Sequence, residues 1–367
     1  MTGAAIELRA VTKTFPGSAT PAVAPLDLTL GAGEITVLIG PSGCGKTTTL
    51  RMINRLTEPT AGTISIGGVD IRDHPLTELR RGIGYVIQQA GLFPHRTVAQ
   101  NIATVPRLLG WDRPRTAERV EELAELVGIA PDQLDRYPAA LSGGQQQRVG
   151  VARALAADPP VLLMDEPFGA VDPIVRAHLQ HELLALQERV HKTIVLVTHD
   201  IDEAILLGDR IAVLNVGGVL EQVAAPDDLL AAPANEFVAS FLGADRSIKR
   251  LSLATVGALR LEAGPGVERR ASAAEVRAVV ERTGLDWLAV TDDGRFMGWV
   301  PVTGLVDGTI GDLTPEPAVA RVRSSSSLRQ ALEVILTSRS SIAVVVDDDD
   351  RYQGAVTLEA IREGLSR

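Results

Sequence analysis

The sequence of 367 residues contains little cysteine, few aromatic residues and little lysine. Its single cysteine, Cys44, excludes an intramolecular disulfide and fits a reducing compartment. Aromatic residues make up 3% of the chain and hydrophobic residues 45%, so we expect an ordered protein with an aliphatic core. Only four of the 36 lysine and arginine residues are lysines, which draws attention to Lys46 in a glycine-rich segment.

Three further absences narrow the functional class. The formal net charge of −10 lacks the basic footprint of a nucleic-acid-binding protein and gives no attraction to an anionic membrane. The first residues, MTGAAIELRA, have no basic start followed by an apolar stretch, so we expect no signal peptide. No apolar run approaches the ~18 residues that cross a bilayer. The length predicts two or three domains. The negative charge leads us to expect no nucleic acid as a partner.

The apolar pattern predicts an α/β chain with a mixed sheet. We expect strands near residues 6–11, 26–30 and 34–39, then a helix over 47–56 and more strands within 60–90. Residues 98–158 have helical spacing. Two apolar runs, VLLM before Asp165 and TIVLVT before His199, are typical of buried parallel strands. Residues 211–223 predict a closing hairpin.

The segment GPSGCGKT at 40–47, the phosphate loop, matches G-x-x-x-x-G-K-[ST] between a predicted strand and a helix start. Its glycines allow the backbone to wrap around phosphates, and the exposed N–H groups supply partial positive charge. Lys46 would contact the β- and γ-phosphates as a point charge, and Thr47 would hold Mg²⁺. The motif therefore predicts ATP and Mg²⁺ as cofactors, bound by Gly40, Ser42, Gly43, Cys44, Gly45, Lys46, Thr47 and Thr48.

Two acidic residues follow the apolar run VLLM. Asp165 and Glu166 would stand at the carboxyl end of that strand, where ligands bind in α/β sheets. Asp165 would act on Mg²⁺, and Glu166 would orient and deprotonate the attacking water. Taken alone, the pattern also fits a strand that ends in a solvated turn.

A second anion site is predicted where LSGGQQQRV begins a helix, with Ser142 as its N-cap. Gly143 and Gly144 expose backbone N–H groups beside Gln145. One chain thus has two phosphate-binding helix starts about 100 residues apart. The economical interpretation is a head-to-tail homodimer that holds each nucleotide between the phosphate loop of one copy and Ser142–Gln145 of the other.

Across residues 1–242 the sequence resembles the ATPase subunits of ATP-binding-cassette transporters. The resemblance implies a P-loop NTPase cassette at 1–242, with a mixed sheet core and a helical subdomain at about 90–158. It further implies that Phe15 stacks on adenine, that Gln88 touches the metal and water, that Asp172 lies in the loop crossing the dimer, and that His199 contacts the γ-phosphate. It also implies integral membrane permease subunits as partners and a peripheral position on the cytoplasmic face of the membrane.

The residues after 242 contain an internal repeat. AVTDDGRFMGWV at 289–300 aligns with VVDDDDRYQGAV at 345–356 at an offset of 56, which predicts two small α+β modules. The acidic run 347–350 fits a solvated turn, with a metal site as the alternative. The tail resembles tandem CBS-type modules, implying a linker at 243–260, a first repeat at 261–312 and a second at 313–367.

This tail, with QAGLFPHRTV after Gln88, resembles the importer branch for glycine betaine, choline, carnitine and proline. The branch implies an extracellular or periplasmic solute-binding protein, and regulation by ionic strength or by an adenine-containing ligand such as cyclic di-AMP. The aspartate that contacts ribose in such modules is replaced by Gly304 and Ala360. A tail that serves mainly in dimerisation and docking therefore stays open.

The resemblance thus predicts the ATPase subunit of a solute importer. An importer for another small solute remains an alternative, as does a non-transport cassette ATPase acting on DNA or ribosomes. The latter class is typically marked by tandem cassettes, coiled-coil insertions or basic surfaces, and this acidic sequence contains none of them. A purely sensory nucleotide-binding protein would not need Glu166 and His199.

Overall fold

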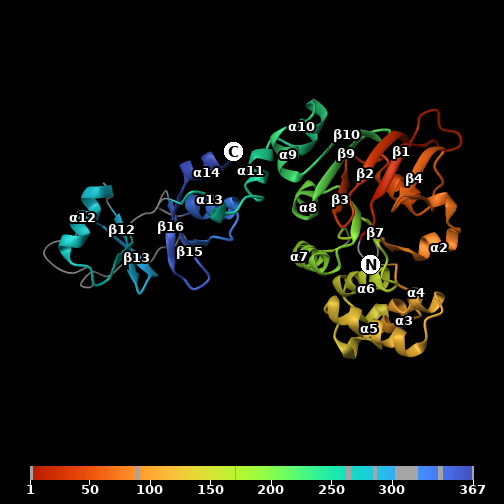
Figure 1. The fold of residues 1–367 in the computed structure, drawn as a ribbon, viewed down its shortest axis with the longest axis horizontal. Coiled ribbons are helices and arrows are strands. Elements are labelled where there is room, and N and C mark those ends of the chain that lie inside the picture. The colour runs from red at the N-terminus through yellow and green to blue at the C-terminus, as the bar shows by residue number, and fades with distance from the viewer. Residues whose placement is uncertain are drawn as a thin grey trace. The chain divides into compact units, whose positions relative to one another are not determined.

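The computed structural model describes residues 3–87, 91–169, 171–261, 266–283, 287–301, 321–337 and 342–365. The chain divides into two compact units, Met1–Gly243 and Ala244–Arg367, each of which is described by itself (Figure 1). Among the described residues, no helix combines the length and apolarity that a membrane crossing requires.

The first unit contains a six-stranded sheet in which every strand except β10 runs parallel to its neighbours. Its order is β10 (Val219–Ala224), β9 (Arg210–Asn215), β3 (Ile35–Ile39), β8 (Thr193–Val197), β7 (Val161–Asp165) and β6 (Ile83–Val86). Strands β3 and β8 are buried along their whole length, as expected for continuous apolar runs between helices. The antiparallel pair β9–β10 is the predicted hairpin.

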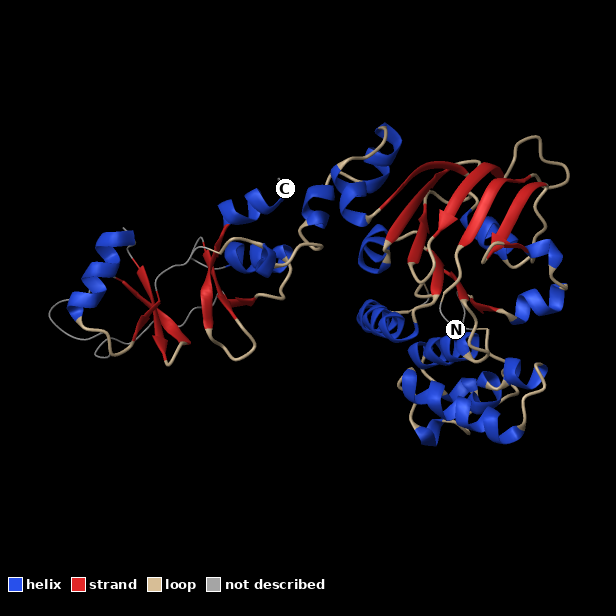
Figure 2. Ribbon diagram, viewed as in Figure 1, coloured by secondary structure: helices blue, strands red, loops and turns tan. Residues whose placement is uncertain are grey.

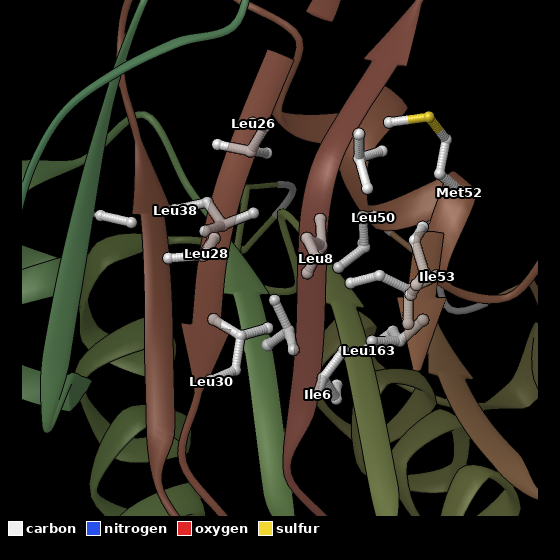
Figure 3. Close-up of a cluster of buried hydrophobic side chains, with 14 of the residues drawn as sticks. Ile6, Leu8, Leu26, Leu28, Leu30, Leu38, Leu50, Met52, Ile53 and Leu163 are labelled. Carbon is white, nitrogen blue, oxygen red and sulfur yellow. The ribbon is translucent and has the colours of Figure 1, made fainter. Parts of the chain in front are cut away.

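A second, antiparallel sheet has the order β2 (Val23–Leu30), β1 (Ile6–Lys13), β4 (Ala61–Ile66) and β5 (Val69–Asp70). Leu26, Leu28 and Leu30 of β2 are buried and alternate with exposed residues, because one face of this sheet covers the core. Figure 3 shows their side chains gathered with those of Leu50 in α1 (Lys46–Ile53) and Leu163 in β7. This aliphatic core anchors the helix that follows the phosphate loop.

The remaining helices of this unit include an all-helical part between β6 and β7 (Figure 2). It consists of α3 (Val98–Ile102), α4 (Thr104–Leu108), α5 (Arg113–Leu126) and α6 (Gly143–Leu155). The sequence predicted this helical region. The other helices of the unit are α2 (Leu76–Arg81), α7 (Pro173–Val190), α8 (Ile201–Leu207), α9 (Pro226–Ala231) and α10 (Glu236–Leu242).

The second unit contains two three-stranded sheets with the same element order. The first comprises β11 (Gly266–Glu268), α12 (Ala273–Thr283), β12 (Trp287–Asp292) and β13 (Arg295–Pro301). The second comprises β14 (Arg321–Arg323), α13 (Leu328–Thr337), β15 (Ile342–Val346), β16 (Tyr352–Thr357) and α14 (Leu358–Leu365). In the second copy β16 is followed directly by α14, whereas the residues that follow β13 in the first copy lie outside the described residues.

The two copies share fine detail as well as order. Gly298 and Gly354, which the 56-residue offset aligns, have φ angles of 153° and 143° at an irregular step in each hairpin. The copies also contact each other, since the Phe296 and Tyr352 rings stack with centroids 5.9 Å apart and Arg295 forms a β-bridge with Arg351.

Of the stretch 243–260, expected as a linker, residues 244–260 belong to the second unit. They form α11 (Arg246–Arg250) and a short 3₁₀ turn at Val256–Ala258. Leu251 and Val256 are buried in the core of the second repeat, and Leu328 N donates a hydrogen bond to Ala254 O. This arrangement differs from the expected linker, because Leu251 and Val256 pack with residues that follow roughly 70 to 110 positions later, from Val322 to Ile361.

Candidate functional site

The phosphate loop joins the buried strand β3 to helix α1, as the motif predicts. Gly40 and Gly45 have φ angles of 151° and 96°, a region that L side chains rarely adopt. A Cβ atom on Gly40 would lie 2.1 Å from Leu214 O, and one on Gly45 would lie 2.6 Å from Ala22 O. The two glycines are therefore required by both conformation and space, and they give the loop its cradle shape.

Lys46 is the first residue of α1 and is 8% exposed. Its ammonium group donates hydrogen bonds to Gly40 O at 2.8 Å and Pro41 O at 3.1 Å, and it lies 3.6 Å from the buried Cys44 Sγ. The charge is thus held inside the curve of the loop, where a phosphate can replace the carbonyl contacts. A planar guanidinium would not match this compact position.

Strand β7 delivers its two acidic residues to the same place. Thr47 donates a hydrogen bond from its hydroxyl to Asp165 Oδ1 at 2.9 Å, so the two predicted magnesium ligands are adjacent. Glu166 has a φ of 47°, a strained conformation for a residue other than glycine, and its N–H donates to Val197 O at 2.9 Å. Because β7 ends at Asp165, this conformation turns the chain at Glu166 out of the strand direction.

His199 and Glu166 face each other at the ends of neighbouring strands. The distance between His199 Nδ1 and Glu166 Oε1 is 3.4 Å, and the side chains are 67% and 26% exposed. Both border a cavity of about 500 Å³. The cavity is lined by Ala22, Ser42, Gly43, Cys44, Gly45, Lys46, Thr47, Thr48, Glu166 and His199. The residues are suited to a triphosphate beside an acid–base pair.

Two residues implied by the resemblance are not placed at this cavity. Phe15 is 43% exposed, lies under the Lys13 ammonium at 5.1 Å, and is not among the lining residues. Gln88 lies outside the described residues.

The second helix start, Ser142–Gln145, forms a capping box. Ser142 Oγ accepts from Gln145 N at 3.3 Å, and Gln145 Oε1 accepts from Ser142 N at 2.9 Å. Gly143 is exposed, whereas Gly144 packs so closely on α7 that a Cβ would lie 2.7 Å from Val175 Cγ1. These residues do not line the cavity of their own chain.

Asp172 caps α7 in the same manner, with Oδ1 accepting from Val175 N at 3.1 Å. It is exposed and likewise not among the residues that line the cavity. The side chain is thus fixed at the start of a long helix.

Sequence reasoning missed two residues near the site, Tyr85 and Ala22. Burial and the neighbouring Asp165 carboxylate raise the pKa of Tyr85, which keeps its hydroxyl neutral beside the predicted magnesium ligand. Ala22 supplies a wall of the cavity from the turn before β2. Neither belongs to a recognisable motif, so only the fold could reveal them.

In the tail, the acidic turn 347–350 is organised by its own backbone. Asp347 accepts hydrogen bonds from Asp349 N, Arg351 N and Gln353 Nε2, and those from Arg351 and Asp349 help to hold its pKa below the usual range. No cluster of His, Cys, Asp or Glu suited to a metal occurs in the part of the chain that the structure describes. Ala360 N donates to Thr357 Oγ1 at the start of α14, and Gly304 lies outside the described residues.

Family comparisons agree with this division of the chain. A model described as "ABC transporter" matches residues 23–169, and one described as "CBS domain" matches residues 310–367.

Similar proteins extend over nearly the whole length. The chain is 47% identical over 370 residues to the osmoprotectant import ATP-binding protein OsmV of Salmonella typhimurium, covering 98% of this chain and 96% of that protein. It is 46% identical over 361 residues to the choline transport ATP-binding protein OpuBA of Bacillus subtilis, covering 96% and 94%. A solved dimeric ATP-binding cassette in a post-hydrolysis state with ADP and Pi is 35% identical, with a TM-score of 0.54 over 60% of this chain and 98% of that one.

Proposed function

Because this chain belongs to the ATP-binding-cassette transporter ATPases that carry a C-terminal CBS domain, we propose that two copies bind and hydrolyse ATP to power a solute importer. The observation that carries this proposal is the cavity in which the phosphate loop faces Glu166 and His199. A phosphate cradle alone would suffice for binding. An acid–base pair beside it is what hydrolysis requires.

The geometry supports a proposed role for each residue. The phosphate loop and Lys46 hold the β- and γ-phosphates. Thr47 and Asp165 would hold Mg²⁺, which would neutralise charge developing on the phosphates. Glu166 orients and deprotonates the attacking water, and His199 contacts the γ-phosphate and the Glu166 carboxylate.

A second copy completes the site in this proposal. Ser142, Gly143 and Gly144 present N–H groups at a helix start that does not line the cavity of its own chain. The economical use for them is the γ-phosphate held by the neighbouring copy, with Asp172 in the segment that crosses between copies. Phe15 and Gln88 keep their expected roles, adenine stacking and metal contact.

For the cargo, we propose a compatible solute of the glycine betaine, choline, carnitine or proline type. The support is that the osmoprotectant and choline proteins align with this chain through the tail as well as the cassette. The chain would act on the cytoplasmic face with separate permease subunits and an external solute-binding protein. Cyclic di-AMP or another regulatory ligand would need contacts other than the missing ribose-binding aspartate at Ala360.

Glu166→Gln tests the ATPase part. The amide keeps the shape of the side chain but cannot accept the proton of water, so we expect ATP binding with turnover lost. The closed dimer should then accumulate with ATP, measured by size exclusion with light scattering, together with phosphate release. Glu188→Gln, an exposed residue of α7, is the matched control. Normal turnover of Glu166→Gln would remove Glu166 from the base role.

The cargo is tested in the reconstituted complex. ATP hydrolysis with the permease and binding protein should rise with a quaternary amine and not with a polyamine or sugar. Stimulation by a polyamine alone would refute the cargo proposal and leave the ATPase proposal intact. The same assay with varied salt and cyclic di-AMP tests the tail.

A further inference from the structure

Arg176 lies in the first turn of α7 and connects two segments that the proposed reaction needs. Its Nη2 donates a hydrogen bond to Val171 O at 3.3 Å, directly before Asp172. Its Nη1 lies 3.6 Å from Asp200 Oδ2, directly after His199. One guanidinium therefore contacts both the Asp172 segment and the His199 segment. It can do so because its two terminal nitrogen atoms, Nη1 and Nη2, are separate donors.

The two carboxylate oxygens of Asp200 have different partners. Oδ1 caps α8 by accepting from the N–H groups of Asp202 and Glu203, at 2.9 and 3.1 Å. Oδ2 is the oxygen that faces Arg176. The position of α8 and the position of Arg176 are thus linked through a single side chain.

The residue on the other side of His199 is fixed from within. Thr198 is 2% exposed, donates its hydroxyl to the buried carboxylate of Glu203, and accepts from Asp200 N at 3.1 Å. The pKa of Glu203 is raised above its usual value, chiefly by burial and also by the nearby Asp200, although contacts with Thr198 and Arg176 oppose this. His199 is 67% exposed, yet both its neighbours are held, so its placement depends on this small network.

One atom of the network, Arg176 Nε, is buried without a hydrogen-bond partner among the described residues. Buried polar atoms are normally paired, and each exception needs an explanation. The Arg176–Asp200 contact is itself long and about a third exposed, so it contributes little to folding. Its consequence is geometric, because it fixes where the His199 segment sits relative to the Asp172 segment.

We propose that Arg176 is a positioning residue that couples the Asp172 segment to His199. When the neighbouring copy engages Asp172, the guanidinium transmits that placement through Asp200 to His199, which then meets Glu166 and the γ-phosphate. This inference rests on the proposed function, since it requires Asp172 to face the other copy and His199 to act in hydrolysis.

The test compares full-length variants in ATP hydrolysis. Arg176→Ala should lower kcat by roughly 10–100-fold, the size of effect expected from a displacement of about 1 Å at a reacting group. ATP affinity and the melting temperature should stay close to wild type, because the phosphate loop is untouched. Arg189→Ala, an exposed arginine on the same helix, should keep wild-type kcat.

A double-variant cycle separates positioning from a general structural effect. If Arg176 acts through His199, Arg176→Ala should cause no further loss in a His199→Ala background, measured as single-turnover phosphate release with enzyme in excess. Additive losses would overturn the coupling. Wild-type rates in His199→Ala would instead overturn the role of His199 in the proposed function.

Asp200→Asn gives an independent variant that keeps the α8 cap. The amide oxygen still accepts from Asp202 N and Glu203 N, but the charge that faces Arg176 is lost. We expect a kcat defect in the same direction as Arg176→Ala, with little added by combining the two. A wild-type kcat in Asp200→Asn together with a wild-type kcat in Arg176→Ala would refute the proposal while leaving Glu166 as the base.

Discussion

Lys192 is the most deeply buried lysine of the first unit, at 1% exposed against 8% for Lys46. Its burial allows a specific stability prediction. Its side chain is 2% exposed, and Nζ lies 2.6 Å from Asp158 Oδ1, whose side chain is 41% exposed. The pair is therefore asymmetric. The ammonium has little contact with water, whereas the carboxylate can be hydrated without moving far.

Asp158→Asn removes the negative charge that lies 2.6 Å from the buried Lys192 ammonium. Breaking a buried pair costs about 3–5 kcal/mol, and the amide oxygen still accepts a hydrogen bond, so we expect a loss of about 2–4 kcal/mol. Asparagine tolerates the left-handed φ of 52° at this position, so backbone strain adds little. Lys192→Met removes the buried charge together with its desolvation cost, and the Asp158 side chain is already 41% exposed, so its cost should be below about 1 kcal/mol.

The pH dependence follows from the same contact. Burial raises the pKa of Asp158, but nearby positive charges and hydrogen bonds, those of Lys192 among them, together outweigh burial, and the pKa is lowered below its ordinary value of 3.8. A carboxyl with a depressed native pKa stabilises the fold above its ordinary value, and this stabilisation is lost as the pH falls through the native value. The difference between wild type and Asp158→Asn should therefore shrink below about pH 4.

Calorimetric unfolding of the full-length chain measures these effects. A domain of this size loses about 2–4 °C in Tm per kcal/mol, so Asp158→Asn should melt roughly 4–16 °C lower near pH 7. Lys192→Met should shift by no more than about 4 °C. The reasoning would be refuted if Lys192→Met proved as damaging as Asp158→Asn, because the asymmetry in exposure would then have no consequence.

Two predictions concern the tail. Tyr352 has a buried hydroxyl without a hydrogen-bond partner among the described residues, and burial raises its pKa to about 12. In urea unfolding, Tyr352→Phe should therefore leave the tail as stable as wild type or about 1 kcal/mol more stable. A loss above about 1 kcal/mol would show that the hydroxyl is paired. Leu251→Ala should destabilise the tail by about 2–5 kcal/mol, because Leu251 is 3% exposed in the second repeat's core, whereas Leu336→Ala, at 69% exposed, should change it by less than about 0.5 kcal/mol.

The sequence predicted the parts of the site that are written in contiguous residues. The phosphate loop, the Asp165–Glu166 strand end and the capped start at Ser142 each need only one segment, so their local chemistry is legible in order. The phosphate loop and Glu166 meet at one cavity because the parallel strands that precede them end at the same edge of the sheet, whereas Ser142 does not line that cavity. The role of Phe15 in stacking on adenine stays a prediction, since the residue lies in the loop after β1, against Lys13, and does not line the cavity.

Tertiary partners explain what the sequence missed. Arg176 and Asp200 stand 24 positions apart on different helices, and no period or motif joins them. Tyr85 reaches Asp165 only because β6 and β7 are neighbours in the sheet. The sequence predicts a linker at 243–260 because nothing nearby in the chain reveals the partners of Leu251 and Val256, which lie in β14, α13 and α14.

That misplaced stretch changes how the tail can be dissected. Leu251 and Val256 enter the same core as Leu328 and Ile361, so residues 246–259 and 321–365 form one module and the first repeat is inserted within it. A cut after Gly243 would separate two intact cores. A cut near residue 310 falls between the two repeats in the sequence. It would separate Leu251 and Val256 from Leu328 and Ile361, expose these apolar side chains to water and yield a fragment prone to aggregate.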